Sequence, residues 1–276
     1  MKRNVILSVN EDPQYLFYVP IALWSWQKIG WNPVLFFHDG GAVLTKPLFE
    51  LVLNSTEVQR LKPIKGYRSD TIAQISRLYG ALCVEPGEIV MTADLDLIPL
   101  GDWWSPDPSK ITIYNHDLTG YSDYAICYLA ATRERWIEIM GITGDYNAMI
   151  ARDLKQIPNA HESVEWEKRW TVDQAYITER IKAVQFQKEF IPAGRLPSGL
   201  AKGRVDRGGW TLNHETFRDA HLHRDLYKRF QNPSDERYAL FQKKWEEHMT
   251  LLHTVWPNEN WDWFVTYTKE FSKLAQ

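Results

Sequence analysis

The chain contains 276 residues, of which 44% are hydrophobic and 24% are charged, a composition that fits one large α/β domain or a domain with a helical extension. Its formal net charge is -3 and it has no long lysine or arginine block, which argues against a surface built to neutralise nucleic acid. The first residues hold too short an apolar run for a signal peptide, and no segment approaches a transmembrane span. We therefore expect a cytoplasmic protein that does not associate with membranes.

Several familiar sequence signatures are missing. The sequence has no Gly-x-Gly-x-x-Gly fingerprint, no Gly-Lys-Ser/Thr phosphate loop and no Cys-x-x-Cys pair. These absences argue against dinucleotide oxidoreductases, P-loop enzymes and zinc modules. Cys83 and Cys127 both lie in apolar stretches, which predicts two reduced core thiols rather than a disulfide.

The first part of the chain predicts alternating strands and helices. Residues 4–10 and 33–38 read as buried strands, followed by helices over 15–29 and 48–53. Pro20 favours a later start for the first helix, because proline is tolerated in a first turn, and Gly30 ends it. A helix that begins at Ser69 or Asp70 and continues through Leu82 leads to a strand over 88–93. Such alternation predicts a parallel sheet with helices on its faces.

The second part of the chain is less regular. Strands are predicted over 111–114 and 124–130, and Thr132 and Thr171 are expected to cap helices over 133–140 and 171–181. Periodicity weakens over 144–170, which we interpret as a mobile or acceptor-facing excursion, and 194–209 reads as a loop. Residues 226–252 read as helical with an interruption at Pro233, and the aromatic segment 261–267 is expected to pack back onto the domain. We therefore divide the chain into a catalytic domain, 1–225, and a helical C-terminal extension, 226–276.

Asp94 and Asp96 directly follow the predicted strand over 88–93. In an extended backbone, residues two apart project to the same side, so both carboxylates would address one point beyond the strand end. Ligands of open α/β sheets gather at that edge. Mg²⁺ and Mn²⁺ prefer oxygen ligands and, with one or two carboxylates, keep positions for diphosphate oxygens. The pair therefore predicts a divalent metal and diphosphate site, and the alternative is a structural turn with capping acids.

With these elements in order, the chain resembles the GT-A fold glycosyltransferases. The opening strand 4–10 is similar to the one that receives the nucleotide, and 89–100 is similar to the strand that carries their Asp-x-Asp motif. Residues 122–134 resemble the strand and capped helix that flank the sugar site, and 171–175 resemble the Asp-Gln segment that follows. The resemblance covers residues 4–225 and implies a Rossmann-like, mixed and mostly parallel sheet flanked by helices.

The resemblance implies transfer of a sugar from a nucleoside-diphosphate donor, with a UDP-sugar favoured, to a carbohydrate or glycan acceptor, as in hexosyltransferases. It implies Mn²⁺ or Mg²⁺ on Asp96, with Asp94 on the metal or on the donor ribose. For the base that deprotonates the acceptor hydroxyl in an inverting reaction, Asp173 is preferred, with Asp123 or Asp117 as alternatives. The alternative for Asp173 is a carboxylate that is stabilised by the helix dipole.

Further candidate site residues come from the resemblance, from side-chain chemistry and from position in the chain. In several GT-A families a histidine near the domain end completes the metal site, which points to His221 first and His223 second. Arg68 and Arg77 are candidates for the donor phosphates, because guanidinium groups match phosphate oxygens. Ser8 and Asn10, at the end of the first strand, are candidates for the nucleotide base or ribose.

Two other functions remain open at this point. A metal-dependent nucleotidyltransferase would use the same acids on a triphosphate and release pyrophosphate. A non-catalytic carbohydrate-binding protein would use the 13 tryptophans, whose faces stack on sugars.

Overall fold

A computed structural model describes residues 1–38, 46–53, 58–118, 122–196, 198–199, 201–213, 217–231, 234 and 236–275. A seven-stranded sheet in the order β3-β2-β1-β4-β7-β6-β8 forms its centre. β7 runs antiparallel to its neighbours β4 and β6, whereas the remaining neighbouring strands are parallel. The strands are β1 (Arg3–Asn10), β2 (Asn32–His38), β3 (Val58–Leu61), β4 (Ile89–Thr92), β6 (Ile111–Tyr114), β7 (Leu129–Thr132) and β8 (Lys188–Ile191). The predicted mixed, mostly parallel sheet is confirmed.

A second, smaller sheet joins distant parts of the chain. It has the order β5-β10-β9, in which β10 is antiparallel to β5 and parallel to β9. Its strands are β5 (Leu97–Pro99), β9 (Arg204–Asp206) and β10 (Asp219–His221). β5 follows β4 after one turn, so this sheet brings segments beyond residue 200 to the end of β4. The prediction of loop throughout 194–209 is wrong at β9, because three residues are too few to show a strand periodicity.

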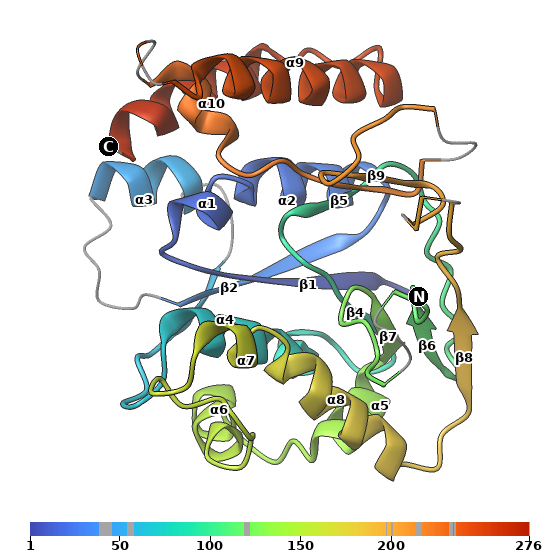
Figure 1. Cartoon of the computed structure of the whole chain (residues 1–276). Helices are drawn as coiled ribbons and strands as arrows, with labels where there is room; N and C mark the ends of the chain where they lie inside the picture. The colour runs from blue at the N-terminus through green and yellow to red at the C-terminus, as the bar shows by residue number, and fades with distance from the viewer. Residues whose placement is uncertain are drawn as a thin grey trace.

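Helices cover both faces of the large sheet (Figure 1). One face carries three helices from the first part of the chain, α1 (Pro13–Leu16), α2 (Val19–Lys28) and α3 (Lys46–Leu53). The C-terminal helices lie above them: the 3-10 helix η2 (Leu226–Phe230), α9 (Tyr238–Val255) and α10 (Asp262–Leu274). The other face carries α4 (Ser69–Ser76), the 3-10 helix η1 (Arg77–Cys83), α5 (Arg133–Met140), α6 (Tyr146–Leu154), α7 (Trp166–Arg169) and α8 (Val172–Ala183). Each face has its own apolar cluster of buried residues.

The C-terminal helices share a core with the start of the chain. The buried ring of Phe17 lies 5.3 to 5.8 Å from the rings of four residues beyond 226, namely Tyr227, Phe264, Tyr267 and Phe271. Aromatic pairs at such distances add to the stabilisation that burial provides. The aromatic segment 261–267 thus packs onto the domain. The boundary at residue 225 stays a prediction, and Pro233 lies outside the described residues.

Several predicted elements have different bounds in the structure. The first predicted helix is two helices, with Pro20 in the first turn of α2 as expected. The helix predicted from Ser69 is an α-helix only as far as Ser76, and a 3-10 helix continues from Arg77. The strand predicted over 124–130 begins only at Leu129, because 122–128 forms turns and bends instead. The weak periodicity of 144–170 hides two helices, α6 and α7, and whether this segment is mobile or faces an acceptor stays a prediction.

In the described part of the chain, no helix combines the length and the hydrophobicity needed to cross a bilayer.

Candidate active site

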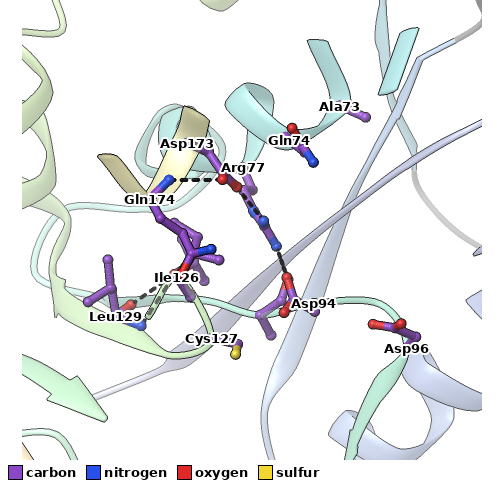
Figure 2. A network of polar contacts seen from close by, with 12 residues as sticks. Ala73, Gln74, Arg77, Asp94, Asp96, Ile126, Cys127, Leu129, Asp173 and Gln174 are labelled. Carbon is purple, nitrogen blue, oxygen red and sulfur yellow. Dashed lines mark hydrogen bonds and ion pairs between the residues drawn. The ribbon is translucent and has the colours of Figure 1, made fainter. Parts of the chain in front are cut away.

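The candidate site lies where β4 ends. The strand stops at Thr92, and the backbone then turns, with the Leu97 amide donating to the Asp94 carbonyl at 3.3 Å. The extended backbone predicted for Asp94 and Asp96 is therefore wrong, because the chain must turn here to enter β5. As a result the two carboxylates have different partners, and Asp96 lies to one side of Asp94 in Figure 2.

Asp94 is half-buried and belongs to a group that is centred on the buried Arg77. The Arg77 guanidinium pairs with Asp94 through Nη1 and with Asp173 through Nη2 (Figure 2). Nη1 also donates to the Ala93 carbonyl at 3.2 Å. These contacts join η1, the end of β4 and the start of α8. The structure thus brings together three residues that the sequence placed in the site separately.

Asp173 is almost completely buried, at 1% exposure, in the first turn of α8. Burial raises the pKa of its carboxyl above the usual range, although the charge of Arg77 opposes that effect. Cys127 lies on the other side of Asp94, and burial together with the Asp94 charge raises the pKa of its thiol. Cys127 is therefore a protonated thiol at neutral pH, and it is free of any disulfide, as predicted.

Asp96 belongs to a second group, built by the small sheet. His221 ends β10 and Asp206 ends β9, and in the sheet register His221 is paired with Asp206 and with Leu97, the residue after Asp96. Asp96 Oδ2 lies 2.9 Å from Arg207 Nη1 and 3.4 Å from His221 Nε2. His221 Nδ1 lies 3.6 Å from Asp206 Oδ2. Three strand ends therefore converge on one acidic and basic cluster.

The charges of this cluster stabilise one another. Burial acts to raise the pKa of Asp96, but His221 and Arg207 outweigh it and lower the pKa to about 2. Burial likewise opposes the charge of His221, while Asp206 and Asp96 raise the pKa of the imidazole. Asp96 is thus a carboxylate at neutral pH, as a metal ligand has to be.

The donor set of this cluster fits a cation that takes few protein ligands. Among the described residues, no three His, Cys, Asp or Glu side chains are arranged to hold a metal ion. However, Asp96 Oδ2 and His221 Nε2 lie 3.4 Å apart. This distance is near the separation of roughly 3 Å between adjacent ligands of an octahedral ion bound at about 2.1 Å. Mg²⁺ and Mn²⁺ are commonly bound by one or two protein ligands plus phosphate oxygens.

His223 has other partners than His221. Its Nε2 lies 2.9 Å from Glu247 Oε2 of α9, and its ring stacks on Trp210 with centroids 4.3 Å apart. Burial lowers the pKa of His223, although Glu247 opposes that effect. His221 therefore lies beside Asp96, whereas the described contacts of His223 connect it to α9 and to Trp210.

The residues predicted to bind the nucleotide lie around the end of β1. Asn10 ends the strand and donates to Ser69 Oγ at 3.2 Å, while Ser8 is half-buried opposite Phe36 of β2. Arg68 is exposed, with Nε 3.3 Å from Asp70 Oδ2. Asn10 and Arg68 thus lie at the edge where β1 meets α4, whereas Arg77 lies deeper, between the carboxylates.

The two alternative bases differ in accessibility. Asp117 is buried and accepts hydrogen bonds from the amides of Ala193 and Gly194 at 2.7 and 3.1 Å, which is a structural role. Asp123 is half-buried in the segment that leads into β7. There the Tyr124 amide donates to Thr178 Oγ1 of α8 at 2.7 Å.

Sequence reasoning missed Asp206, Arg207 and Cys127 as parts of the site. The signal for the first two was an acid and an arginine before Gly208-Gly209, in a run that reads as a loop. Only the pairing of β9 with β10 shows that this run reaches Asp96.

No protein-family model matches the sequence, and no curated protein matches it either. Solved glycosyltransferases are similar to it at low identity. The glycosyltransferase GlyE of Streptococcus pneumoniae TIGR4 is 15% identical, with a TM-score of 0.38 over 68% of this chain and 45% of its own. The catalytic domain of Drosophila β1,4-galactosyltransferase 7, in complex with xylobiose, is 13% identical, with a TM-score of 0.43 over 88% of this chain and 80% of its own. A mutant of that enzyme in complex with manganese, UDP-Gal and xylobiose is 12% identical, with a TM-score of 0.40 over 87% and 79%.

The chain spans less than half the length of GlyE. Likeness of this extent decides neither an activity nor a substrate. The function therefore has to be argued from the site residues.

Proposed function

We propose that the chain is a metal-dependent glycosyltransferase that transfers a sugar from a nucleoside-diphosphate donor, with UDP-sugars favoured, to a carbohydrate acceptor. The observation that carries this proposal is the convergence of Asp94, Arg77, Asp96 and His221 just beyond the end of β4. A parallel strand pair, β1 and β4, ends at this edge, which is where open α/β sheets bind their ligands.

The two groups of the site suit two parts of a donor. The Asp96 and His221 side chains would hold Mn²⁺ or Mg²⁺, and Arg207 adds a positive charge beside them. When bound, the ion would neutralise the charge that develops on the leaving diphosphate. Asp94, fixed by Arg77, would face the donor ribose or sugar. Asn10 and Ser8 would contact the nucleoside at the end of β1.

Deprotonation of the acceptor hydroxyl is the other requirement of the reaction. Asp173, proposed as the base of an inverting reaction, is bonded to Arg77 and buried. To act as a base it would have to be reached by the acceptor after a rearrangement of Arg77. Asp123 is the more accessible carboxylate near β7.

A screen of nucleotide sugars by thermal unfolding, with and without Mn²⁺, tests the proposal. A donor present at about a hundred times its dissociation constant would stabilise the fold by about 2.7 kcal/mol through linkage. We expect a selective donor to raise the melting temperature only with metal. Asp96→Asn should remove this shift and donor turnover, whereas Asp262→Asn, an exposed carboxylate on α10, should leave both unchanged.

The released product separates the alternatives. Nucleoside diphosphate supports glycosyl transfer, and pyrophosphate would instead identify a nucleotidyltransferase. Saccharide binding without any donor turnover would identify a carbohydrate-binding protein. Full activity of Asp96→Asn, or full activity in excess EDTA, would contradict the proposed metal role.

A further inference from the structure

A second candidate binding site lies at the other end of the small sheet. Asp96, Asp206 and His221 occupy one end of β5, β9 and β10, whereas Pro99, Arg204 and Asp219 occupy the opposite end in the same register. A cavity of about 200 Å³ opens there, between the small sheet and the carboxyl ends of β6 and β8. We call it the Trp103 cavity.

Three aromatic residues, Trp103, Trp104 and Tyr114, line the Trp103 cavity. Trp104 and Tyr114 are buried, but Trp103 is 49% exposed. The Trp103 indole is nevertheless held in place, because its Nε1 donates to the Phe217 carbonyl at 2.9 Å and the ring lies directly over Gly101. A fixed and half-exposed indole is a suitable surface for stacking on the C–H face of a sugar ring.

Three basic residues, Lys202, Arg204 and Arg218, also line the cavity, and Asp219 is the acid among the lining residues. Asp219 forms a bidentate pair with Arg204 at 2.6 and 2.7 Å, so its charge is already balanced. Arg218 is oriented by the Pro192 carbonyl at 3.3 Å from Nη1, and the Lys202 side-chain stem packs beside Gly194. The lining therefore has an excess of positive charge.

We propose that the Trp103 cavity binds a sugar residue that carries a negative charge, either a carboxylate or a phosphate group. Stacking on Trp103 would select the sugar ring, and Lys202 with Arg218 would select the anion. A volume of about 200 Å³ is below the roughly 300–1,000 Å³ of pockets for larger ligands, so the cavity suits one monosaccharide unit rather than a whole nucleotide sugar.

The Trp103 cavity and the candidate active site share one segment of backbone. Asn115, which lines the cavity, donates to the Cys127 carbonyl at 3.3 Å, and the Cys127 thiol faces Asp94. The next residue, Tyr128, donates to Asp219 at 3.0 Å. In the reaction proposed above, the charged sugar would be a unit of the acceptor glycan, and this assignment to the acceptor rests on the proposed function.

Ligand-observed NMR on the whole chain in EDTA tests the cavity without any donor or metal. The probes are glucuronic acid, glucose 6-phosphate, glucose and inorganic phosphate, each titrated separately. We expect at least one of the two charged sugars to bind about tenfold or more tightly than either glucose or phosphate. The comparison between glucuronic acid and glucose 6-phosphate decides which anion the cavity selects. Equal binding of glucose and both charged sugars, or phosphate binding as tight as theirs, would overturn the proposal.

Matched variants locate the binding. Lys202→Glu and Arg218→Gln should each weaken binding of the charged sugar by about tenfold or more, because a charge-assisted hydrogen bond is lost. Trp103→Ala should weaken it, while Trp103→Phe should retain most of it. Lys155→Glu, at an exposed lysine after α6, should have no effect. Unchanged binding in Lys202→Glu and Arg218→Gln would exclude the Trp103 cavity as the site.

The test of the Trp103 cavity can fail or succeed independently of the test of the glycosyltransferase proposal. Asp96→Asn should retain binding of the charged sugar, because the cavity lies at the opposite end of the small sheet. Sugar binding with no donor turnover would leave the cavity assignment intact and contradict only the glycosyltransferase. Donor turnover without binding of a charged sugar would leave the glycosyltransferase proposal intact and contradict only the cavity assignment.

Discussion

The buried Arg77 connects two carboxylates, the half-buried Asp94 and the buried Asp173. Its side chain is 8% exposed, and burial alone would disfavour its charge, but the two carboxylates compensate and raise its pKa. Removing one partner of a buried ion pair costs about 3–5 kcal/mol, because a charge is left without its partner. Arg77 is thus both a structural link between η1, β4 and α8 and the cation nearest to Asp94.

Asp173→Asn distinguishes a base from a positioning residue. If Asp173 holds Arg77, we expect Asp173→Asn and Arg77→Ala to lower kcat/KM for the donor by similar factors, about tenfold or more. The double variant should then be no worse than either single variant. A general base makes kcat rise with pH, and if that base is not Asp173 this rise should persist in Asp173→Asn. Loss of that rise in Asp173→Asn alone would instead identify Asp173 as the general base.

Thermal unfolding of each variant serves as the control for folding in this comparison. Arg77→Lys keeps the charge but loses the geometry that reaches both carboxylates. It should therefore fold better than Arg77→Ala and still show reduced donor affinity.

At the scale of elements, the packing of η1 on β1 sets the position of Arg77, the first residue of η1. Gly80 lies in this 3-10 helix directly against Ile6 in the centre of β1. A Cβ atom at Gly80 would lie 2.3 Å from Ile6 Cγ1 and 2.6 Å from Cδ1. Because both elements are buried, neither can move without disturbing the sheet.

Gly80→Ala is expected to lower the free energy of unfolding by about 1–3 kcal/mol through overpacking. The measurement is chemical denaturation. Combined with Ile6→Ala, which removes the clashing atoms, the loss should be smaller than the sum of the two single losses. Gly144→Ala is the matched control, since no atom lies within 4 Å of a Cβ there. An additive double variant would contradict the close contact.

At the scale of the whole molecule, stability is expected to depend on pH through His248. This residue of α9 is fully buried and packs against Phe264 of α10, with ring centroids 5.6 Å apart. Burial lowers the pKa of His248 from 6.5 to about 3. Between these values the unfolded chain binds a proton at His248 and the folded chain does not, so the folded state loses stability as the pH falls.

At about pH 5 the loss due to His248 should be about 2 kcal/mol relative to neutral pH. His248→Leu should remove this part of the pH dependence, whereas His253→Leu, at an exposed histidine of the same helix, should not. Urea denaturation of the three proteins at several pH values is the measurement. Equal slopes of stability against pH in the parent and in His248→Leu would show that His248 is not the cause.

The sequence by itself determined most strands of the large sheet and most of the helices that cover it, but not the order of the strands within the sheet. Buried strands such as Val5 to Val9 are mostly apolar, and Pro20 and Gly30 bound a helix for local steric reasons. Local patterns also placed Asp94, Asp96, Arg77, Asp173 and His221 in one candidate site, although each entered by a separate argument or by resemblance.

Only the tertiary structure decided which of these residues are partners. The turn after β4 separates Asp94 from Asp96. Contacts across 17 to 125 positions of sequence then pair Arg77 with both Asp94 and Asp173, and pair Asp96 with Arg207 and His221. Short strands such as β9 and β10 carry too few residues for a periodic signal, and their pairing depends on backbone hydrogen bonds with distant segments. Residue type therefore predicted the chemistry of the site, whereas the small sheet determined its geometry.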